Sequence, residues 1–569
     1  MGLLSILIFV PILALFIGLV LPSSKSHLFK CIALASSLVQ VGVVIGLLCN
    51  YCGCSSGFRF TENLDWIDLD LGSLGSISID YYLGVDGINI FLLVLAAFIL
   101  LVGVISSWKM KDNIKGYYSL YLLLSAAIMG CFMALDFFLF FLFFEFMLLP
   151  MYFLIGMWGG ARREYASIKF LLYTLLGSLL ILIVMIGLSL SVIDPAETAI
   201  QIGLITSKAQ AGWGVSAHVH QLLAQGGISP SRLVHTFNIE YLTDIKNYVP
   251  GSVFHLASQL TVFGIAIRYA GFLALFIGFA IKLPSIPFHT WLPDAHVEAP
   301  TPVSVILAAL LLKIGAYGII RFTYGIFPEG AVHYAQAVGA LGVLSIIYGS
   351  FNALAMQDLK KMIAYSSIAH MGFVLLGIAS LTAEGFNGAI FQMFSHGILS
   401  ALLFLLAGVI YDRTGDRLIE NYRGLASKMP IYTIIITIAF FASLGLPGFS
   451  GFIGELFVLM GAFSSSSTNG LLPIWMAIVA TFGLLIGAAY FLWTLQRMFF
   501  GKFWLRRSDL WNNLPDITVR EKLMMIPLVL AAIAFGLYPA LFFHLVSPSV
   551  SEFVANIVAE GKSNIHFLK

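Results

Sequence analysis

The 569-residue chain is 60% hydrophobic and only 10% charged, and its formal net charge is +2. Soluble domains carry about 25% charged residues, so a chain this apolar is expected to have lipid as its main solvent. The small net charge argues against a nucleic-acid partner. The sequence also contains no glycine-rich dinucleotide motif, phosphate-binding loop or haem-attachment motif. The composition therefore predicts an integral membrane protein with no redox centre or bound cofactor of its own.

Fourteen apolar runs are long enough to cross a bilayer, which takes about 20 residues. They lie near residues 2–22, 29–49, 86–107, 117–135, 137–158, 165–193, 266–288, 300–322, 335–355, 361–381, 386–411, 429–460, 472–499 and 523–547. The first run has neither a basic leader nor a small-residue cleavage site, so we expect a retained helix. The predicted fold is all-α and polytopic, with one transmembrane domain over residues 1–550 and a tail over 551–569. The polar stretch 194–262 is predicted to be an extramembrane loop that could hold a short surface helix.

Basic residues are unevenly divided between the two faces of this topology. Nineteen of the 30 Lys and Arg residues fall in one set of alternate loops, which includes Lys360 and Lys361, and eight fall in the other, which includes Arg268 and Arg321. Cytoplasmic loops carry the excess of positive charge. The sequence therefore predicts that both termini face the non-cytoplasmic side, most simply in a bacterial inner membrane.

Two groups of residues resemble metal sites. Cys49, Cys52 and Cys54 cluster at the end of the second run, apart from Cys31 and Cys131, but no fourth ligand stands at a suitable spacing. The second group consists of His289, Asp294, His296 and Glu298. Two prolines and a predicted position in a loop argue against a metal site there. We expect no metal at either place.

Five charged residues lie inside apolar runs: Glu145, Lys169, Lys282, Lys313 and Glu455. A charge at the centre of a membrane helix costs at least about 2.5–3.5 kcal/mol, and ionisable residues at this depth are usually functional. The alternative for Glu145 is an inert, permanently protonated acid. Lys169 is close enough to a basic loop to extend its amine to the interface, so both interpretations stay open for it.

Glu145 follows Asp136 by nine residues, or about 13.5 Å along a helix, which predicts a position near the middle of the bilayer. Lys313 lies deep in its apolar run, far from polar surface. His370 and His396 each stand near the middle of a run. A lone buried histidine is usually structural, but two beside buried Lys and Glu favour a proton relay, because imidazole titrates near neutral pH.

Prolines interrupt two of the runs next to a buried charge. Pro284 and Pro287 follow Lys282, and Pro447 with several glycines precedes Glu455. Broken helices beside ionisable groups are typical of ion paths in transporters. The two breaks fall in the seventh and twelfth runs, five apart. This spacing predicts two inverted five-helix repeats, helices 4–8 and 9–13, over about 117–322 and 335–499.

Several motifs of the sequence resemble those of a known family. Phe279-Ala-Ile-Lys-Leu-Pro284, His289-Thr-Trp-Leu-Pro-Asp294, Leu310-Leu-Leu-Lys-Ile-Gly315, Ser366-Ser-Ile-Ala-His370 and Leu444-Gly-Leu-Pro-Gly-Phe-Ser-Gly-Phe-Ile-Gly-Glu455 are similar to the antiporter-like membrane subunits of proton-pumping NADH–quinone oxidoreductase (respiratory complex I). The resemblance covers residues 1–550. Two features distinguish this chain from a sister branch of the family. Glu455 is acidic where the sister branch has lysine, and the sequence shows no long lateral helix. The stretch 194–235 matches no feature of the family.

The resemblance implies a function and a set of roles. Glu145 and Lys282 would form a charge pair whose opening changes the proton affinity of Lys282. Lys313, His370 and His396 would relay the proton, and Glu455 would release it outward. NADH, FMN, iron–sulfur clusters and quinone are expected in partner subunits, including other antiporter-like subunits. The alternatives are a subunit of a multi-subunit cation/proton antiporter, which shares most of these motifs, and a channel-like scaffold in which the buried charges are dispensable.

Overall fold

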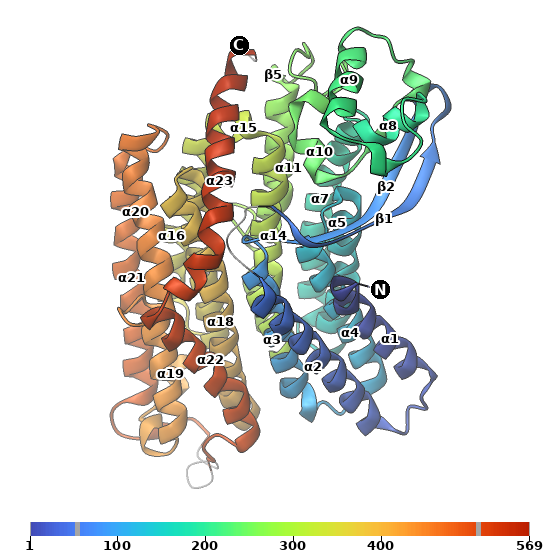
Figure 1. The fold of residues 1–569 in the computed structure, drawn as a ribbon. Helices are drawn as coiled ribbons and strands as arrows, with labels where there is room; N and C mark the ends of the chain where they lie inside the picture. The colour runs from blue at the N-terminus through green and yellow to red at the C-terminus, as the bar shows by residue number, and fades with distance from the viewer. Residues whose placement is uncertain (1, 52–56, 508–513, 568–569) are drawn as a thin grey trace.

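The computed structural model describes residues 2–51, 57–507 and 514–567. Its main helices are bundled side by side, with the first half of the chain on the right of Figure 1 and the second half on the left. Twelve helical segments of the described chain are long and apolar enough to cross a membrane. The predicted all-α polytopic class is confirmed.

The uninterrupted long helices of the first half are α1 (Leu3–Val20), α2 (Ser26–Asn50), α3 (Ile90–Ser106), α4 (Ile114–Met133) and α7 (Arg163–Ser189). Between α4 and α7, α5 (Phe137–Phe146) and α6 (Leu148–Trp158) follow each other almost without a gap. Those of the second half are α16 (Ala335–Ala355), α17 (Leu359–Ala379), α18 (Ala383–Thr414), α21 (Ile474–Phe499), α22 (Val519–Leu537) and α23 (Ala540–Asn564).

Two of the predicted spans are broken helices, as the prolines indicated. One is α11 (Ile267–Lys282) followed by α12 (Trp291–Glu298), and the other is α19 (Pro430–Ser443) followed by α20 (Ser450–Thr468). The positive φ angles of Gly445 (78°) and Gly448 (98°) let the chain turn in the second break. The breaks lie where the repeat hypothesis puts them, but the inverted repeat itself stays a prediction.

The span Thr301–Tyr324 combines several helical geometries. It runs through α13 (Thr301–Ile306), the π-helical η6 (Leu307–Leu311), α14 (Leu312–Gly318) and the π-helical η7 (Ile319–Tyr324), and α15 (Pro328–His333) follows it. The most apolar windows of this span and of α18 are completely buried, whereas only about a third of α1, α2, α7 or α21 is buried. Lys313 and His396 are therefore carried by the two central helices, with other helices between them and lipid. Short π-helical stretches often mark functional sites.

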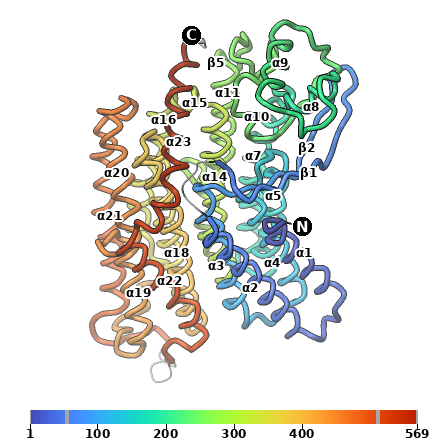
Figure 2. The backbone as a smooth tube through the Cα atoms, in the orientation of Figure 1, coloured from blue at the N-terminus to red at the C-terminus, as the bar shows by residue number. Residues whose placement is uncertain are grey.

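The last predicted span, 523–547, is wrong in detail. It covers most of α22 and the beginning of α23, because the apolar run continues across the junction at Tyr538–Pro539 while proline cannot extend the preceding helix. Helix α23 then rises through the middle of the molecule to the top of Figure 2. Part of the segment predicted as a tail, 551–564, is consequently helical.

A β-hairpin that no apolar run predicts lies between the second and third spans. Strands β1 (Arg59–Asp70) and β2 (Ser76–Val85) pair antiparallel, with Asp65 opposite Asp80, and β3 (Val234–Thr236) adds to β2 in parallel. Two-stranded pairs join β4 (Thr261–Val262) to β5 (Ile265–Ala266) and β6 (Tyr422–Arg423) to β7 (Trp504–Leu505). The hairpin crosses the front of the first half and meets the loop region at the top (Figure 1).

The polar stretch 194–262 is folded. It contains α8 (Pro195–Gln201), α9 (Trp213–Ala224) and α10 (Ile239–Thr243), more than the single short helix that the sequence suggested. A small apolar core of its own holds it together: Ile193, Ala199, Val219, Leu223, Ile228 and Leu233. Lys208 fastens it to the hairpin by an ion pair to Asp65 at 2.6 Å, and within the loop it also pairs with Glu197 of α8.

Candidate functional site: a buried line of ionisable groups

Lys313 and His396 are in direct contact at the centre of the molecule. The Lys313 Nζ lies 2.7 Å from His396 Nδ1 and donates a second hydrogen bond of 2.8 Å to the Ala308 carbonyl. Lys313 is completely buried and His396 is 4% exposed. A neutral imidazole nitrogen accepts from an ammonium group, so a proton can pass between these two atoms without a large movement.

His370 and Glu455 continue the line. The rings of His396 and His370 are 5.3 Å apart between centroids, and His370 Nδ1 lies 3.2 Å from Glu455 Oε1. The four groups come from α14, α18, α17 and α20. The structure therefore brings together four of the seven predicted residues, Lys313, His396, His370 and Glu455, in one continuous buried row.

Glu145 and Lys282 lie outside this row, and their side chains do not contact each other. Lys282 ends α11, where its Nζ donates to the Phe144 carbonyl at 3.3 Å and lies over the Phe144 ring. Glu145 Oε1 has no hydrogen-bond partner among the described residues. The ion pair that the resemblance implied is thus open in this structure, although the two groups remain near enough to interact electrostatically.

Gly315 explains how the Lys313 helix packs against the break after Lys282. A Cβ on Gly315 would stand 2.7 Å from the Leu283 amide nitrogen and 2.9 Å from the Phe279 carbonyl oxygen, closer than side-chain atoms approach backbone. Only glycine allows this approach. The broken helix and the helix that carries Lys313 are therefore packed backbone against backbone at Gly315.

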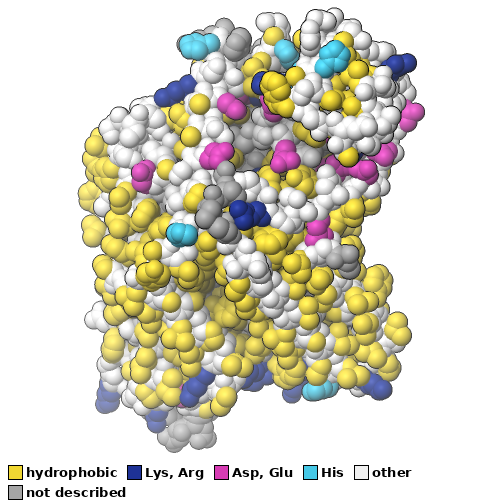
Figure 3. All heavy atoms as spheres, viewed as in Figure 1, with side chains coloured by type: hydrophobic (Ala, Val, Ile, Leu, Met, Phe, Trp, Pro, Cys, Tyr) yellow, Lys and Arg dark blue, Asp and Glu magenta, His cyan; other side chains and the backbone are white. Residues whose placement is uncertain are grey.

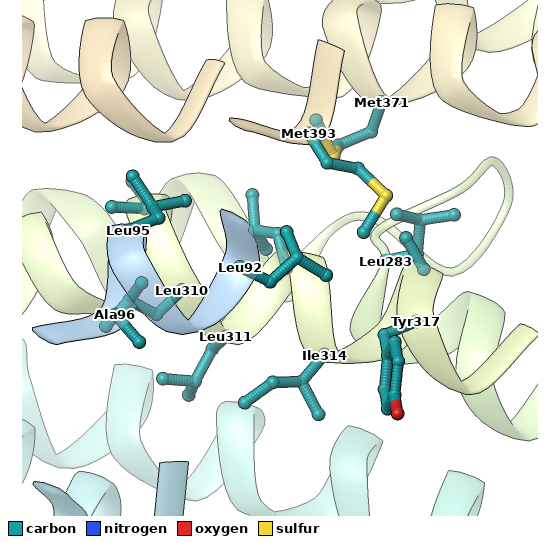
Figure 4. Packing of buried hydrophobic residues seen from close by; sticks show 14 of the residues in the cluster. Leu92, Leu95, Ala96, Leu283, Leu310, Leu311, Ile314, Tyr317, Met371 and Met393 are labelled. Carbon is teal, nitrogen blue, oxygen red and sulfur yellow. The ribbon is translucent and has the colours of Figure 1, made fainter. Parts of the chain in front are cut away.

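Apolar side chains fill the space around this junction. Figure 4 shows Met393 of α18 directed toward Leu283 at the break, with Leu92 of α3 and Ile314 of α14 close by. Protein interiors of this kind are packed about as densely as organic crystals. The Lys282 region and the Lys313 row are thus set in a tightly packed apolar layer.

A cavity with several charged residues in its lining opens at the opposite end of the central helices from the folded loop. Its volume is about 340 Å³, and its lining includes Glu298, Lys360, Asp412 and Arg520. Lys360 was counted as a loop residue in the sequence analysis, but it is 2% exposed and its Nζ donates to the Ala299 carbonyl at 3.1 Å. Nothing in the sequence distinguishes Lys360 from the adjacent Lys361, since both stand in the first turn of α17, shortly after Asp358.

The group of residues that resembled a metal site is dispersed by the fold. Asp294 binds Lys169 at 2.7 Å, and Glu298 lies 3.9 Å from Arg162. His296 stacks on Phe404 with a centroid distance of 4.4 Å. Lys169 and Asp294 are 19% and 23% exposed, so this ion pair is only partly buried, unlike the central row. Of the cysteine cluster, Cys49 is exposed, while Cys52 and Cys54 lie outside the described residues.

Two arginines that the sequence analysis placed in loops are buried instead. Arg268 pairs with Glu329 and Arg321 with Asp86, each at 2.6 Å. The hydropathy pattern missed them because both stand at the ends of apolar runs, where a loop and a buried helix end look alike. Even without them the charge asymmetry is visible in Figure 3, where Lys and Arg line the lower edge and Asp and Glu gather above the apolar belt.

Carboxyl groups on the acidic side are strongly affected by burial. Burial raises the pKa of Asp136, which precedes α5, to about 7 and that of Asp194 to about 6. Burial also raises the pKa of Asp80. In the described chain, one three-carboxylate group has metal-like spacing, Asp65 with Asp80 and Glu197, and the Lys208 amine is bound to two of its members.

Residues 134–207 and 237–483 match the family described as NADH:quinone oxidoreductase/Mrp antiporter, transmembrane. The chain belongs to this family. It is 38% identical to NADH-quinone oxidoreductase subunit M of Rhodobacter capsulatus, over 98% of both chains. It is 35% identical to NADH-ubiquinone oxidoreductase chain 4 of Arabidopsis thaliana, over 98% of this chain and 97% of the relative.

Two solved structures have the same fold. A chain of respiratory complex I from Thermus thermophilus matches with a TM-score of 0.74 and 26% identity, over 98% of this chain and 100% of that one. A chain of the Mrp complex from Dietzia matches with a TM-score of 0.73, over 100% and 99%, but at 20% identity that likeness concerns the fold alone. The family places the protein in the membrane, as its apolar helices predict.

Proposed function

We propose that this chain is the proton-translocating subunit M of an NADH–quinone oxidoreductase. The observation that carries the proposal is the buried row from Lys313 through His396 and His370 to Glu455, in a chain that is 38% identical to a protein of that name. Quinone reduction takes place in partner subunits, which hold NADH, FMN, iron–sulfur clusters and quinone. Other antiporter-like subunits are the expected neighbours in the membrane.

The basic face is the cytoplasmic one in this proposal, because positive loops stay on that side. Both termini then face outward, and the source is a bacterial inner membrane. The cavity beside Lys360 opens to the cytoplasm and supplies protons, and Lys169, paired with Asp294, lies outside its lining. Closing and opening of the Glu145–Lys282 pair changes the proton affinity of Lys282, and the direct packing at Gly315 passes the change to Lys313. Lys313 then gives its proton to His396, and Glu455 releases it.

The test separates a relay from a structural cation at Lys313. Lys313→Arg keeps the positive charge but cannot give up its proton at working pH, whereas Lys313→Ala removes the group. A relay requires both variants to lose proton translocation by about tenfold or more, measured per electron pair in membrane vesicles, with assembly checked on native gels. Substantial pumping by Lys313→Arg would overturn the relay.

The second candidate, a cation/proton antiporter subunit, is supported by the description of the family, which includes Mrp antiporters, and by the fold shared with the Mrp complex. Purification of the native assembly decides between the two. Co-purification with flavin- and iron–sulfur-containing subunits supports the oxidoreductase, and co-purification with small membrane subunits alone supports the antiporter.

A further inference from the structure

His370 has one nitrogen that faces two partners at once. Its Nδ1 lies 3.2 Å from Glu455 Oε1 and also 3.2 Å from the side-chain amide nitrogen of Gln392. Gln392 is on α18, four residues before His396, and is 2% exposed. A ring nitrogen has a single in-plane lone pair or a single hydrogen, so it makes one strong hydrogen bond at a time.

The two partners suit opposite protonation states of Nδ1. Without its proton, Nδ1 accepts a hydrogen bond from the Gln392 amide N–H. With its proton, Nδ1 donates to the Glu455 carboxylate. Gln392 and Glu455 therefore compete for the same atom, and each proton transfer exchanges one partner for the other.

Neighbouring residues confine the Gln392 side chain next to His370. Gly454, which precedes Glu455 on α20, lies so close that a Cβ there would overlap Gln392 Oε1. Gln392, His370, His396 and Ser443 line a cavity of about 10 Å³, on the scale of one water molecule. The Oε1 atom has no hydrogen-bond partner in the described chain. The Gln392 amide is thus buried beside the histidine while its Oε1 atom makes no hydrogen bond. Such an arrangement costs stability, and a functional role would explain it.

We propose that Gln392 is a positioning residue that stabilises the deprotonated form of His370 and so assists the release of its proton to Glu455. The inference rests on the proposed relay function. The other titratable groups around His370 are His396 on α18, with Lys313 behind it on α14, and Tyr490 on α21, which interacts with Glu455. Of these groups and Gln392, the glutamine alone offers a donor that cannot itself titrate.

The test is Gln392→Met, which keeps the length of the side chain and removes the donor. Proton translocation per electron pair is measured from pH 5.5 to 9 in vesicles that contain the whole complex. Loss of the donor weakens the deprotonated state of His370, so the pH at which pumping falls to half on the alkaline side should rise by about 0.5–1 unit, the range of one hydrogen bond. Gln392→Asn keeps the amide but is one methylene too short, and it should reproduce the rise.

Gln40→Met is the matched control. Gln40 is also a completely buried glutamine, on α2, where it donates to the Leu7 carbonyl at 2.9 Å and accepts from Ser125 at 3.0 Å. Its loss should lower the amount of assembled complex and leave the pH profile in place. A wild-type pH profile for the Gln392 variants, or an equal change in Gln40→Met, would refute the role of Gln392. Normal pumping by Lys313→Ala is a different result, since it would refute the relay itself.

Discussion

The charged residues of the site lie in apolar helices that are far apart along the chain. Glu145, Lys282, Lys313 and Glu455 stand out because a charge in an apolar run is costly. Their partners come from distant helices, so spacing could not pair Lys313 with His396. Gln392 was missed because an uncharged polar residue is common in buried helices; its position one turn before His396 was the available signal.

Glu145→Gln tests the group at the start of the path. Glutamine keeps the volume and the hydrogen-bonding capacity of Glu145 but cannot ionise, so the Lys282 pair cannot close. We expect pumping to fall about tenfold or more while the complex assembles normally. The measurement is proton translocation in vesicles beside a native gel. Normal pumping in an assembled Glu145→Gln enzyme contradicts the assignment.

Asp136→Asn tests the effect of burial on a carboxyl group outside the spans. The folded pKa of Asp136 is about 7, above the value of about 3.9 of an unfolded chain. The folded state therefore binds more protons between these values, and the contribution of Asp136 to stability is full below about pH 4 and is lost as the pH rises toward 7. Asparagine also caps helices well, and Asp136 accepts from the Leu139 amide at 2.9 Å.

We expect Asp136→Asn to increase stability only slightly at pH 5, where the loss has begun, and by about 1–3 kcal/mol more at pH 8, the usual cost of an ill-solvated polar group. Thermal unfolding of the purified complex in detergent, followed from pH 5 to 8.5, measures the difference. Equal stability of variant and wild type across that range argues that Asp136 is not desolvated.

At the scale of helices and loops, the prolines predicted both broken helices because a missing N–H has the same effect in any context. The hairpin β1–β2 was missed because the search for long apolar runs passes over alternating strands. The folded loop was missed for a related reason, since its core of six residues is too small to produce an apolar run.

Deletion of residues 196–225 tests whether this folded loop takes part in transport. The deletion removes α8 and α9 and uncovers Leu233 and Ile193, which belong to the same small core. We expect a lower unfolding temperature, because apolar surface becomes exposed, and pumping within about twofold of wild type, because loops tolerate length changes. A deletion variant that assembles but does not pump assigns the loop a role in transport.

At the scale of the whole molecule, composition determined the class, since a chain of this apolarity needs lipid. The arrangement of the two halves of the bundle depends on contacts between residues far apart in the chain, which no local sequence pattern reveals. The clearest is the buried ion pair between Asp86, in the turn before α3, and Arg321 of η7, which joins the N-terminal helices to the central span. Arg321 was interpreted as a loop residue from sequence, so this connection could not be predicted.

The contribution of the Asp86–Arg321 ion pair to the stability of this junction can be tested. Asp86→Asn leaves Arg321 charged, buried and unpaired, which should cost about 3–5 kcal/mol of stability. The double variant Asp86→Asn/Arg321→Met leaves no buried charge and should lose less than the single one. Thermal unfolding in detergent measures both. Asp65→Asn is the control, because the half-exposed pair with Lys208 should contribute about 1 kcal/mol or less. If the double variant is at least as unstable as Asp86→Asn, the charges themselves hold the regions together, and packing around them contributes less than the geometry implies.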